Sequence, residues 1–149
     1  MPERRYIEAG PVARFFNAMV AGLARAGFSL YGTRLLAVRG RKSGDWRTAP
    51  VNPLEHNGAT YLVAPRGETQ WVRNLRASGC GELRLGRRCE AFSATELSDD
   101  EKAPVLRAYL RKWEFEVKAF FAGVGANASD VELRRIAPAH PVFRIMMNG

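Results

Sequence analysis

At 149 residues, with 46% hydrophobic and 26% charged residues, the chain has the composition of a single globular domain, which argues against a disordered or fibrous protein. Lysine and arginine outnumber the acidic residues by 23 to 15, and the formal net charge of +8 favours an anionic partner: nucleic acid, an acidic membrane surface or a small anionic ligand. We find no signal-peptide pattern and no apolar run long enough to span a membrane, so we expect a cytoplasmic protein.

The first predicted element is an amphipathic helix over residues 11–27. Its apolar side chains recur at helical spacing, at Val12, Phe15, Phe16, Met19, Val20 and Leu23. Pro11 suits a first helical turn and Gly27 suits a stop. The pattern predicts a helix that packs on the core or covers a pocket. A peripheral membrane contact through Arg14 and Arg25 is the alternative, with membrane association as its consequence.

Short stretches of strand length follow, separated by turn signals. We expect strands over residues 35–40, 47–54, 59–65, 82–85 and 88–97. Asn57-Gly58 is a strong hairpin signal. Pro50 and Pro53 restrict the second strand to a sheet edge or a bulge. Residues 68–78 predict a short helix.

The last third of the chain predicts a helix and a closing strand. Ser98 and Glu101 have the spacing of a capping box, but Pro104 lies too deep for a helix that starts there. The first turn is therefore separate, or the helix begins nearer Lys102 and continues to Val117. Residues 140–146 predict a strand. Short strands without a βαβ rhythm favour an α+β fold, an antiparallel barrel with helices outside, in one domain over 1–149 with the barrel and C-terminal helix in 34–149.

Residue types that usually carry catalysis or bind metals are sparse. Cys80 and Cys89 form no C-x-x-C motif and flank one predicted hairpin where they do not face each other, so we expect neither a disulfide nor a metal site. His140 has no partner motif, which favours a structural role. No G-x-S-x-G motif is present. No pair of carboxylates stands apart from the surface charge, so no catalytic dyad appears in the sequence.

A basic turn is the most distinctive feature. In VRGRKSGDWRTAP, residues 38–50, four cations surround the turn: Arg39, Arg41, Lys42 and Arg47. Gly40 and Gly44 allow a tight backbone turn whose N–H groups can point at one oxyanion, and Ser43 adds a hydroxyl. The phosphate-loop pattern G-x-x-x-x-G-K-[ST] is absent, which disfavours a nucleoside triphosphatase. The turn predicts a site for another anionic ligand.

Three motifs in order extend this prediction: GRKSG-x-x-R-x-x-P, YLVA-x-x-G and W-x-x-N-L-R-A. Together they resemble the deazaflavin-dependent nitroreductase family, split β-barrel proteins of FMN-binding-like fold that bind coenzyme F420. The resemblance runs from about Leu35 to about Phe92. The chain differs at Pro65, where many members have Ser, and at Gln70, where many have Pro.

The resemblance implies a cofactor site with three parts. The residues implied to hold the phosphate and the start of the acidic tail are Lys42, Ser43, Gly44 and Arg47, with Arg41 and Arg66 adding charge for the glutamate carboxylates. The residues implied around the deazaflavin ring are Pro50, Val51, Ala64 and Trp71. Asn74 is implied to fix the loop. Aromatic residues of the C-terminal helix region that could shape a substrate pocket are Tyr109, Trp113, Phe115, Phe120 and Phe121, with Tyr109 as the candidate proton donor.

The function that the resemblance implies is hydride transfer from reduced F420 to a small conjugated or electron-poor acceptor, such as a quinone, an enone or a nitroaromatic. A non-catalytic split-barrel protein that binds a flavin, a fatty acid or another anionic amphiphile is the alternative, and FMN is the alternative cofactor. Nucleic-acid binding is disfavoured because the basic residues gather in turns. A homodimer is compatible with the family.

Overall fold

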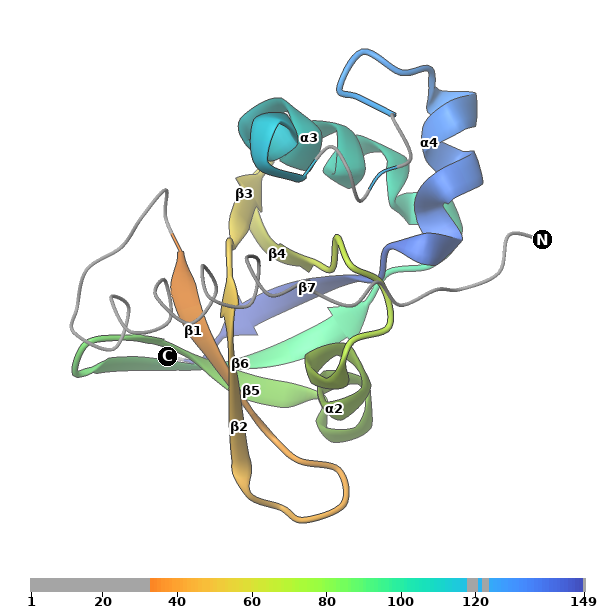
Figure 1. The fold of residues 1–149 in the computed structure, drawn as a ribbon. Helices are drawn as coiled ribbons and strands as arrows, with labels where there is room; N and C mark the ends of the chain where they lie inside the picture. Colours follow the sequence, from red (N-terminus) through yellow and green to blue (C-terminus); the bar gives the residue numbers. More distant parts are fainter. Residues whose placement is uncertain (1–32, 118–120, 122–123, 149) are drawn as a thin grey trace.

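The computed structural model describes residues 33–117, 121 and 124–148 (Figure 1). Seven strands form one antiparallel sheet in the order β2-β1-β5-β6-β7-β4-β3. The strands are β1 (Arg34–Arg39), β2 (Trp46–Val51), β3 (Leu54–His56), β4 (Ala59–Val63), β5 (Cys80–Leu85), β6 (Arg88–Glu96) and β7 (Val142–Met147). The described helices are α2 (Gln70–Ser78), α3 (Ala103–Val117) and α4 (Asp130–Ile136), with the 3-10 turns η1 (Asp99–Glu101) and η3 (Ala137–Ala139). The predicted α+β antiparallel fold is confirmed, whereas the helix expected over 11–27 lies outside the described residues.

The two edge strands of the sheet are consecutive in the chain. β2 ends at Val51 and β3 begins at Leu54, so Asn52 and Pro53 alone connect opposite edges of the sheet. Because each residue step spans at most about 3.6 Å, these edges must lie within roughly 11 Å of each other at this corner. The sheet therefore curls into a half-barrel with a seam between β2 and β3, the split barrel that the resemblance implied (Figure 1).

Local turn chemistry sets the strand boundaries. Asn57 and Gly58 have φ of 50° and 78°, the left-handed conformation that a two-residue hairpin requires, which confirms the predicted turn between β3 and β4. Pro50 lies on the edge strand β2, as predicted. The prediction of one strand over 47–54 is wrong, because the structure has two strands there. The segment divides into β2 and β3 at Pro53, because the chain crosses the seam there.

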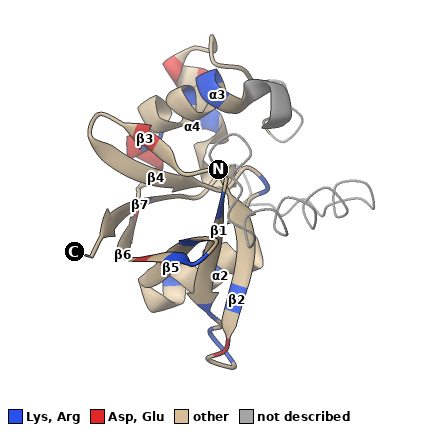
Figure 2. Ribbon diagram, turned by 90° about the vertical axis from the view of Figure 1, so that its left-hand side faces the viewer, with Lys and Arg blue, Asp and Glu red and all other residues tan. Residues whose placement is uncertain are grey.

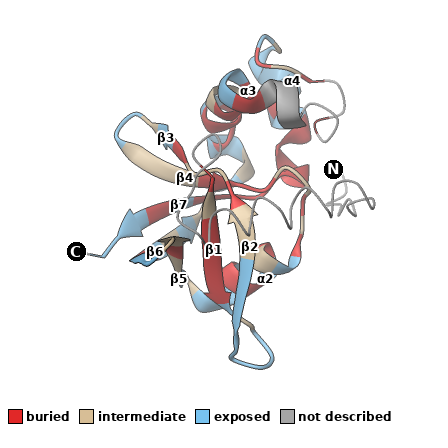
Figure 3. Cartoon of the chain, turned by 60° about the vertical axis from the view of Figure 1, so that its left-hand side comes forward, coloured by how far each residue is buried: buried red, intermediate tan, exposed pale blue. Residues whose placement is uncertain are grey.

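Two hydrophobic cores lie on opposite faces of the half-barrel (Figure 3). The barrel core packs under α2 and contains Leu36, Val38, Val51, Leu62, Ala64, Val72, Leu75, Leu83, Phe92, Phe143 and Ile145. The helical core packs under α3 and α4 and includes Leu54, Val63, Leu106, Tyr109, Leu110, Trp113, Phe121, Leu133, Ile136 and Val142. Successive strand residues point to opposite faces, so the end of β4 (Leu62, Val63) and the start of β7 (Val142, Phe143) are buried on both sides.

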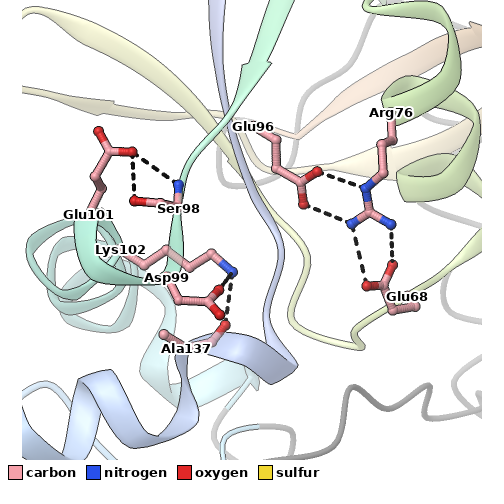
Figure 4. Close-up of polar contacts among 8 residues, drawn as sticks. All are labelled: Glu68, Arg76, Glu96, Ser98, Asp99, Glu101, Lys102 and Ala137. Carbon is pink, nitrogen blue, oxygen red and sulfur yellow. Dashed lines mark hydrogen bonds and ion pairs between the residues drawn. The ribbon is translucent and has the colours of Figure 1, made fainter. Parts of the chain in front are cut away.

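The start of α3 confirms that its first turn is separate. Ser98 and Glu101 form the predicted capping box, but it caps η1, and α3 begins at Ala103 with Pro104 in its first turn, where proline is tolerated. Lys102 lies between the two helices and is fully buried. Its Nζ donates to Asp99 Oδ1 at 2.7 Å and to the Ala137 carbonyl at 3.0 Å (Figure 4). These bonds join the start of α3 to η3.

Helix α4 was not predicted. Its N-cap Ser129 accepts a hydrogen bond from the Glu132 N–H at 3.2 Å, so the S-x-x-E signal was present in the sequence. Seven residues give too short a periodic pattern to be recognised. Arg107 of α3 holds the helix through Asp130 at 2.8 Å, and this contact keeps the pKa of the Asp130 carboxyl below its usual value.

The two cysteines lie apart on the β5–β6 hairpin. Cys80 is opposite Ser93 and Cys89 is opposite Arg84 in the strand register, so both thiols are free, as expected. His140 is fully buried and stacks on Phe121 at 4.0 Å between ring centroids. That environment fits the structural role predicted for it. Within the described part of the chain, no helix has both the length and the apolar character needed to cross a membrane.

Candidate functional site

The basic turn connects β1 to β2, where Figure 2 shows Lys and Arg gathered, and Asp45 also lies in this turn. The Gly40 N–H donates to the Asp45 carbonyl at 2.8 Å, and the Gly44 N–H donates to the Gly40 carbonyl at 2.9 Å. Gly44 has φ +76°, and a Cβ at Gly40 would lie 3.0 Å from Ser43 Oγ. A side chain at Gly44 would therefore be strained, and one at Gly40 would require the Ser43 hydroxyl to shift.

Arg41 ties the turn to helix α2. Its main-chain N–H donates to Asn74 Oδ1 at 3.1 Å, and its Nη1 donates to the same oxygen at 2.8 Å and to Gln70 Oε1 at 2.9 Å. Asn74 is buried and lies one helical turn after Gln70, so both amides face the basic turn. Because both partners are neutral, the guanidinium keeps its net positive charge in this position.

The four cations of the turn have different surroundings. Arg39 stacks over the Trp46 ring at 4.1 Å and donates to the Gly44 carbonyl at 3.2 Å, so it supports the hairpin. Lys42 and Arg47 are exposed, and neither has an ion-pair or hydrogen-bond partner among the described residues. Arg41, Lys42 and Arg47 are therefore the cations that remain for a ligand.

The prediction that the N–H groups of the turn point together at one oxyanion is wrong. The N–H groups of Gly40, Arg41 and Gly44 are bonded as described above, and that of Asp45 donates to Ser43 Oγ at 3.2 Å. Most amides of the turn are therefore used in holding its own shape. The turn offers a ligand cationic side chains and the Ser43 hydroxyl, but no concave array of amides.

An apolar surface continues from the turn along β2. Arg47 is paired with Val38 across the strands, so it lies on the sheet face that carries the barrel core, as does Val51. Pro50 is paired with Leu35 and lies on the opposite face. Pro50 and Val51, the two ring contacts that the resemblance implied on β2, thus lie on opposite faces of the sheet. Only Val51 faces the barrel core.

The β4–α2 connection supplies the other implied ring contacts. Ala64 is buried in the barrel core, and the half-buried Trp71 packs beside Phe143 with 6.1 Å between ring centroids. Arg66 lies half-buried in the same connection. The sequence thus brings Val51, Ala64 and Trp71 to one core, although they are far apart in the chain.

An ion-pair network that the sequence did not predict anchors this connection. Arg76 of α2 donates to both Glu96 oxygens at 2.7 Å and to Glu68 at 3.0 and 3.3 Å (Figure 4). The hydrogen bond that Arg76 donates to Glu96 raises the pKa of the Arg76 guanidinium. Partial desolvation lowers this pKa, and the hydrogen bond to Glu68 raises it further. Because its partners lie on β6 and before α2, no local pattern could have identified the network.

Tyr109 does not line this site. It is 3% exposed in the helical core, with ring centroids 5.0 Å from Trp113 and 6.1 Å from Phe121. Figures 1 and 2 both place α3 at the opposite end of the molecule from the β1–β2 turn. Tyr109 belongs to the helical core, whereas Val51 and Ala64 belong to the barrel core, so the structure gives no support to Tyr109 as the proton donor. The expectations for the side chains of Phe115 and Phe120 lie outside the described part.

The arrangement suits an elongated ligand with a flat apolar part and an anionic part. In the barrel core, Val51 and Ala64 are buried and Trp71 is half-buried, and the turn offers cations that lack carboxylate partners among the described residues. In the described residues, no group of three or more His, Cys, Asp or Glu side chains could share a metal ion. A deazaflavin with a phosphate and an acidic tail fits this set of side chains.

Residues 12–120 match the model of the F420H(2)-dependent quinone reductase family. The chain belongs to this family. It is therefore an F420-dependent reductase, and the predicted cofactor and enzyme class are confirmed. A search of curated proteins gave no match.

Solved structures share the fold. One described as a domain-swapped dimer is 19% identical with a TM-score of 0.57, and the alignment covers 91% of this chain and 96% of that one. A structure of an F420-H2 dependent reductase, FDR-A, is 19% identical with a TM-score of 0.55, covering 77% and 94% of the two chains. The heme storage protein HutZ from Vibrio cholerae is 10% identical with a TM-score of 0.50, covering 80% and 83%. At these identities the likeness concerns the fold alone.

Proposed function

We propose that this F420-dependent reductase transfers a hydride to a small conjugated or electron-poor acceptor, a quinone, an enone or a nitroaromatic. The observation that carries the proposal is the basic turn, in which Arg41, Lys42 and Arg47 keep their charge beside the barrel-core face. No carboxylate of the described residues neutralises them. An anionic cofactor bound there would have its ring beside apolar side chains.

The proposed cofactor contacts follow the geometry of the two surfaces. We assign the anionic half of the cofactor to Arg41, Lys42, Ser43, Gly44, Arg47 and Arg66. We assign the ring to the surface of Val51, Ala64 and Trp71, with Pro50 at the strand edge. Asn74 acts on the cofactor through Arg41 and is a positioning residue.

When bound, reduced F420 supplies the hydride. The chain binds and orients the cofactor through the cations of the turn, and it excludes water from the ring through the apolar surface. Two-electron reduction of a quinone or an enone also needs a proton. Because Tyr109 is buried away from this surface, we assign that proton to solvent.

Anaerobic oxidation of reduced F420, followed by its absorbance, tests the proposal. We expect turnover with at least one of a quinone, an enone and a nitroaromatic, and its loss in the Lys42→Ala/Arg47→Ala variant. Arg87→Ala, which removes a cation from the exposed β5–β6 turn, is the matched control and should keep full activity. Saturable binding without turnover of any acceptor would instead favour a non-catalytic binding protein.

We also propose a homodimer. Large apolar side chains are exposed at Trp46 and at the end of β7, where Met146 and Met147 are 62% and 42% exposed. A fold neighbour that covers 91% of the chain is described as a domain-swapped dimer. Light scattering on the purified chain should give twice the mass of one chain, and a single-chain mass at micromolar concentration would contradict the proposal.

A further inference from the structure

A cavity of about 440 Å³ lies between the β3–β4 turn and the helices α3 and α4. His56 and Asn57 line it from the turn, and Asp130 and Arg134 line it from α4. Figures 1 and 2 place these elements at the other end of the molecule from the basic turn. Since one water molecule occupies about 30 Å³, the cavity has room for about fifteen waters, which is a common size for a ligand site. A small organic molecule therefore fits it, not only a bare ion.

Three arginines line this cavity, and their contacts differ. Arg107 donates from Nη1 to the Ala126 carbonyl at 2.7 Å and from Nη2 to Asp130 Oδ1 at 2.8 Å. Arg111 lies one turn after Arg107 on α3, and Arg134 lies one turn after Asp130 on α4. Both are exposed, and neither has a hydrogen-bond or ion-pair partner among the side chains that the structure describes. Arg107 thus holds α4 against α3, and the other two guanidinium groups remain for a ligand.

The directions of the two helices place these free arginines on either side of the ion pair. Lys102, just before α3, donates to the carbonyl of Ala137, just after α4, whereas the α3–α4 ion pair lies at the start of α4. The helices therefore run antiparallel. Arg134 lies toward the start of α3, and Arg111 lies one turn beyond the ion pair. Both side chains can turn toward an anion between them without breaking a contact in the described chain.

The lining of the cavity has a small excess of positive charge. Its carboxylates are Asp130, which is bound to Arg107, and Asp100, which is exposed on η1. Three guanidinium groups exceed these two by one, and His56 adds an imidazole. Like charges on one concave surface repel each other, and an anion between them relieves the repulsion. Apolar surface lies beside the charges, from Ala103, Pro104 and Ala108 of α3.

We propose that this cavity is a second ligand site, which binds a small organic molecule through an oxyanion group, a phosphate or a carboxylate. Arg111 and Arg134 donate to the oxyanion, because the guanidinium fork matches both groups. The rest of the molecule packs on the apolar side of α3. Arg107 is a positioning residue that sets the distance between the helices. The site is separate from the F420 site and does not depend on it.

NMR titrations of the ¹⁵N-labelled protein at constant ionic strength test the site, because the amides that shift locate the ligand. The probes are phenyl phosphate, benzoate and the neutral benzyl alcohol. We expect both anions to shift the amides of Ala108, Arg111 and Arg134, and the alcohol to bind at least tenfold more weakly. Tighter binding of phenyl phosphate would identify a phosphate ligand, and tighter binding of benzoate would identify a carboxylate.

Two double variants separate this site from general attraction to a basic protein. Arg111→Gln/Arg134→Gln should bind both anions at least tenfold more weakly. Arg87→Gln/Arg88→Gln, which removes the same charge from the exposed β5–β6 turn, should bind them like the wild type. Both variants should keep the wild-type denaturation midpoint, since all four side chains are exposed. Shifts confined to the basic turn, equally tight binding of the alcohol, or an equal loss in both variants would each overturn the site.

Discussion

Two arginines make contacts at helix α2, and their partners differ in charge. Arg41 joins the basic turn to α2, and Arg76 joins α2 to the β4–α2 connection and to β6. Arg41 is held by the neutral amides of Gln70 and Asn74, so it carries a net charge into the basic turn. Arg76 is held by the carboxylates of Glu68 and Glu96, and its charge is neutralised there. Arg41, with neutral partners, is thus available to an anionic ligand, whereas Arg76, with carboxylate partners, supports the structure.

The same distinction applies to the other cations of the turn. Lys42 and Arg47 have no partner in the described chain, whereas Arg39 stacks on Trp46. A count of basic residues therefore overstates the binding surface, and their contacts identify the part that can hold an anion. Changes at these positions should separate cofactor affinity from stability.

The largest expected effect is on affinity. Lys42→Ala/Arg47→Ala should weaken F420 binding by about 100-fold, because two charge-assisted contacts are lost. The free energy of unfolding should change by less than about 0.5 kcal/mol, since both side chains are exposed. Fluorescence titration and urea denaturation of the same preparation measure the two quantities. Equal affinity in the double variant would remove these cations from the site.

A smaller effect is expected from Asn74→Asp, which converts the surroundings of Arg41 into those of Arg76. The carboxylate would accept the same two hydrogen bonds and neutralise the guanidinium. F420 affinity should fall about tenfold while the unfolding free energy is kept or raised. Tighter F420 binding by this variant would contradict the role of a charged Arg41.

The smallest effect on F420 affinity is expected from Arg76→Ala, which removes the ion pairs with Glu68 and Glu96. The Arg76 side chain is 40% exposed, so solvent screens its ion pairs, and we expect about 1 kcal/mol loss of unfolding free energy. F420 affinity should change by less than about threefold, because Arg76 faces Glu68 and Glu96. A loss of affinity as large as that of the turn variants would place Arg76 in the binding machinery.

Features encoded by neighbouring residues were predictable from the sequence. The Asn57-Gly58 hairpin and the Ser98–Glu101 capping box each depend on two to four consecutive residues, and the structure has both. The basic turn was also visible as a cluster. The prediction that its backbone N–H groups are available to an anion was wrong. The sequence does not show that these groups are bonded within the turn and to Asn74.

Features that depend on contacts between distant residues were not predictable. The Arg76 network joins residues 20 positions apart, and the Arg41 contact with Asn74 spans 33. Tyr109 has helical spacing that fits either a core or a pocket, and only the packing of α3 against α4 shows that it is buried. The pair Gln70 and Asn74 did carry a signal, since residues four apart share a helix face.

Titration of the wild-type protein with F420, beside FMN at the same ionic strength, tests the central claim most directly. The account predicts saturable fluorescence quenching by F420 and none by FMN, because the cations without carboxylate partners at the turn match a phosphate with an acidic tail. Binding of FMN alone, or of neither compound, would contradict it.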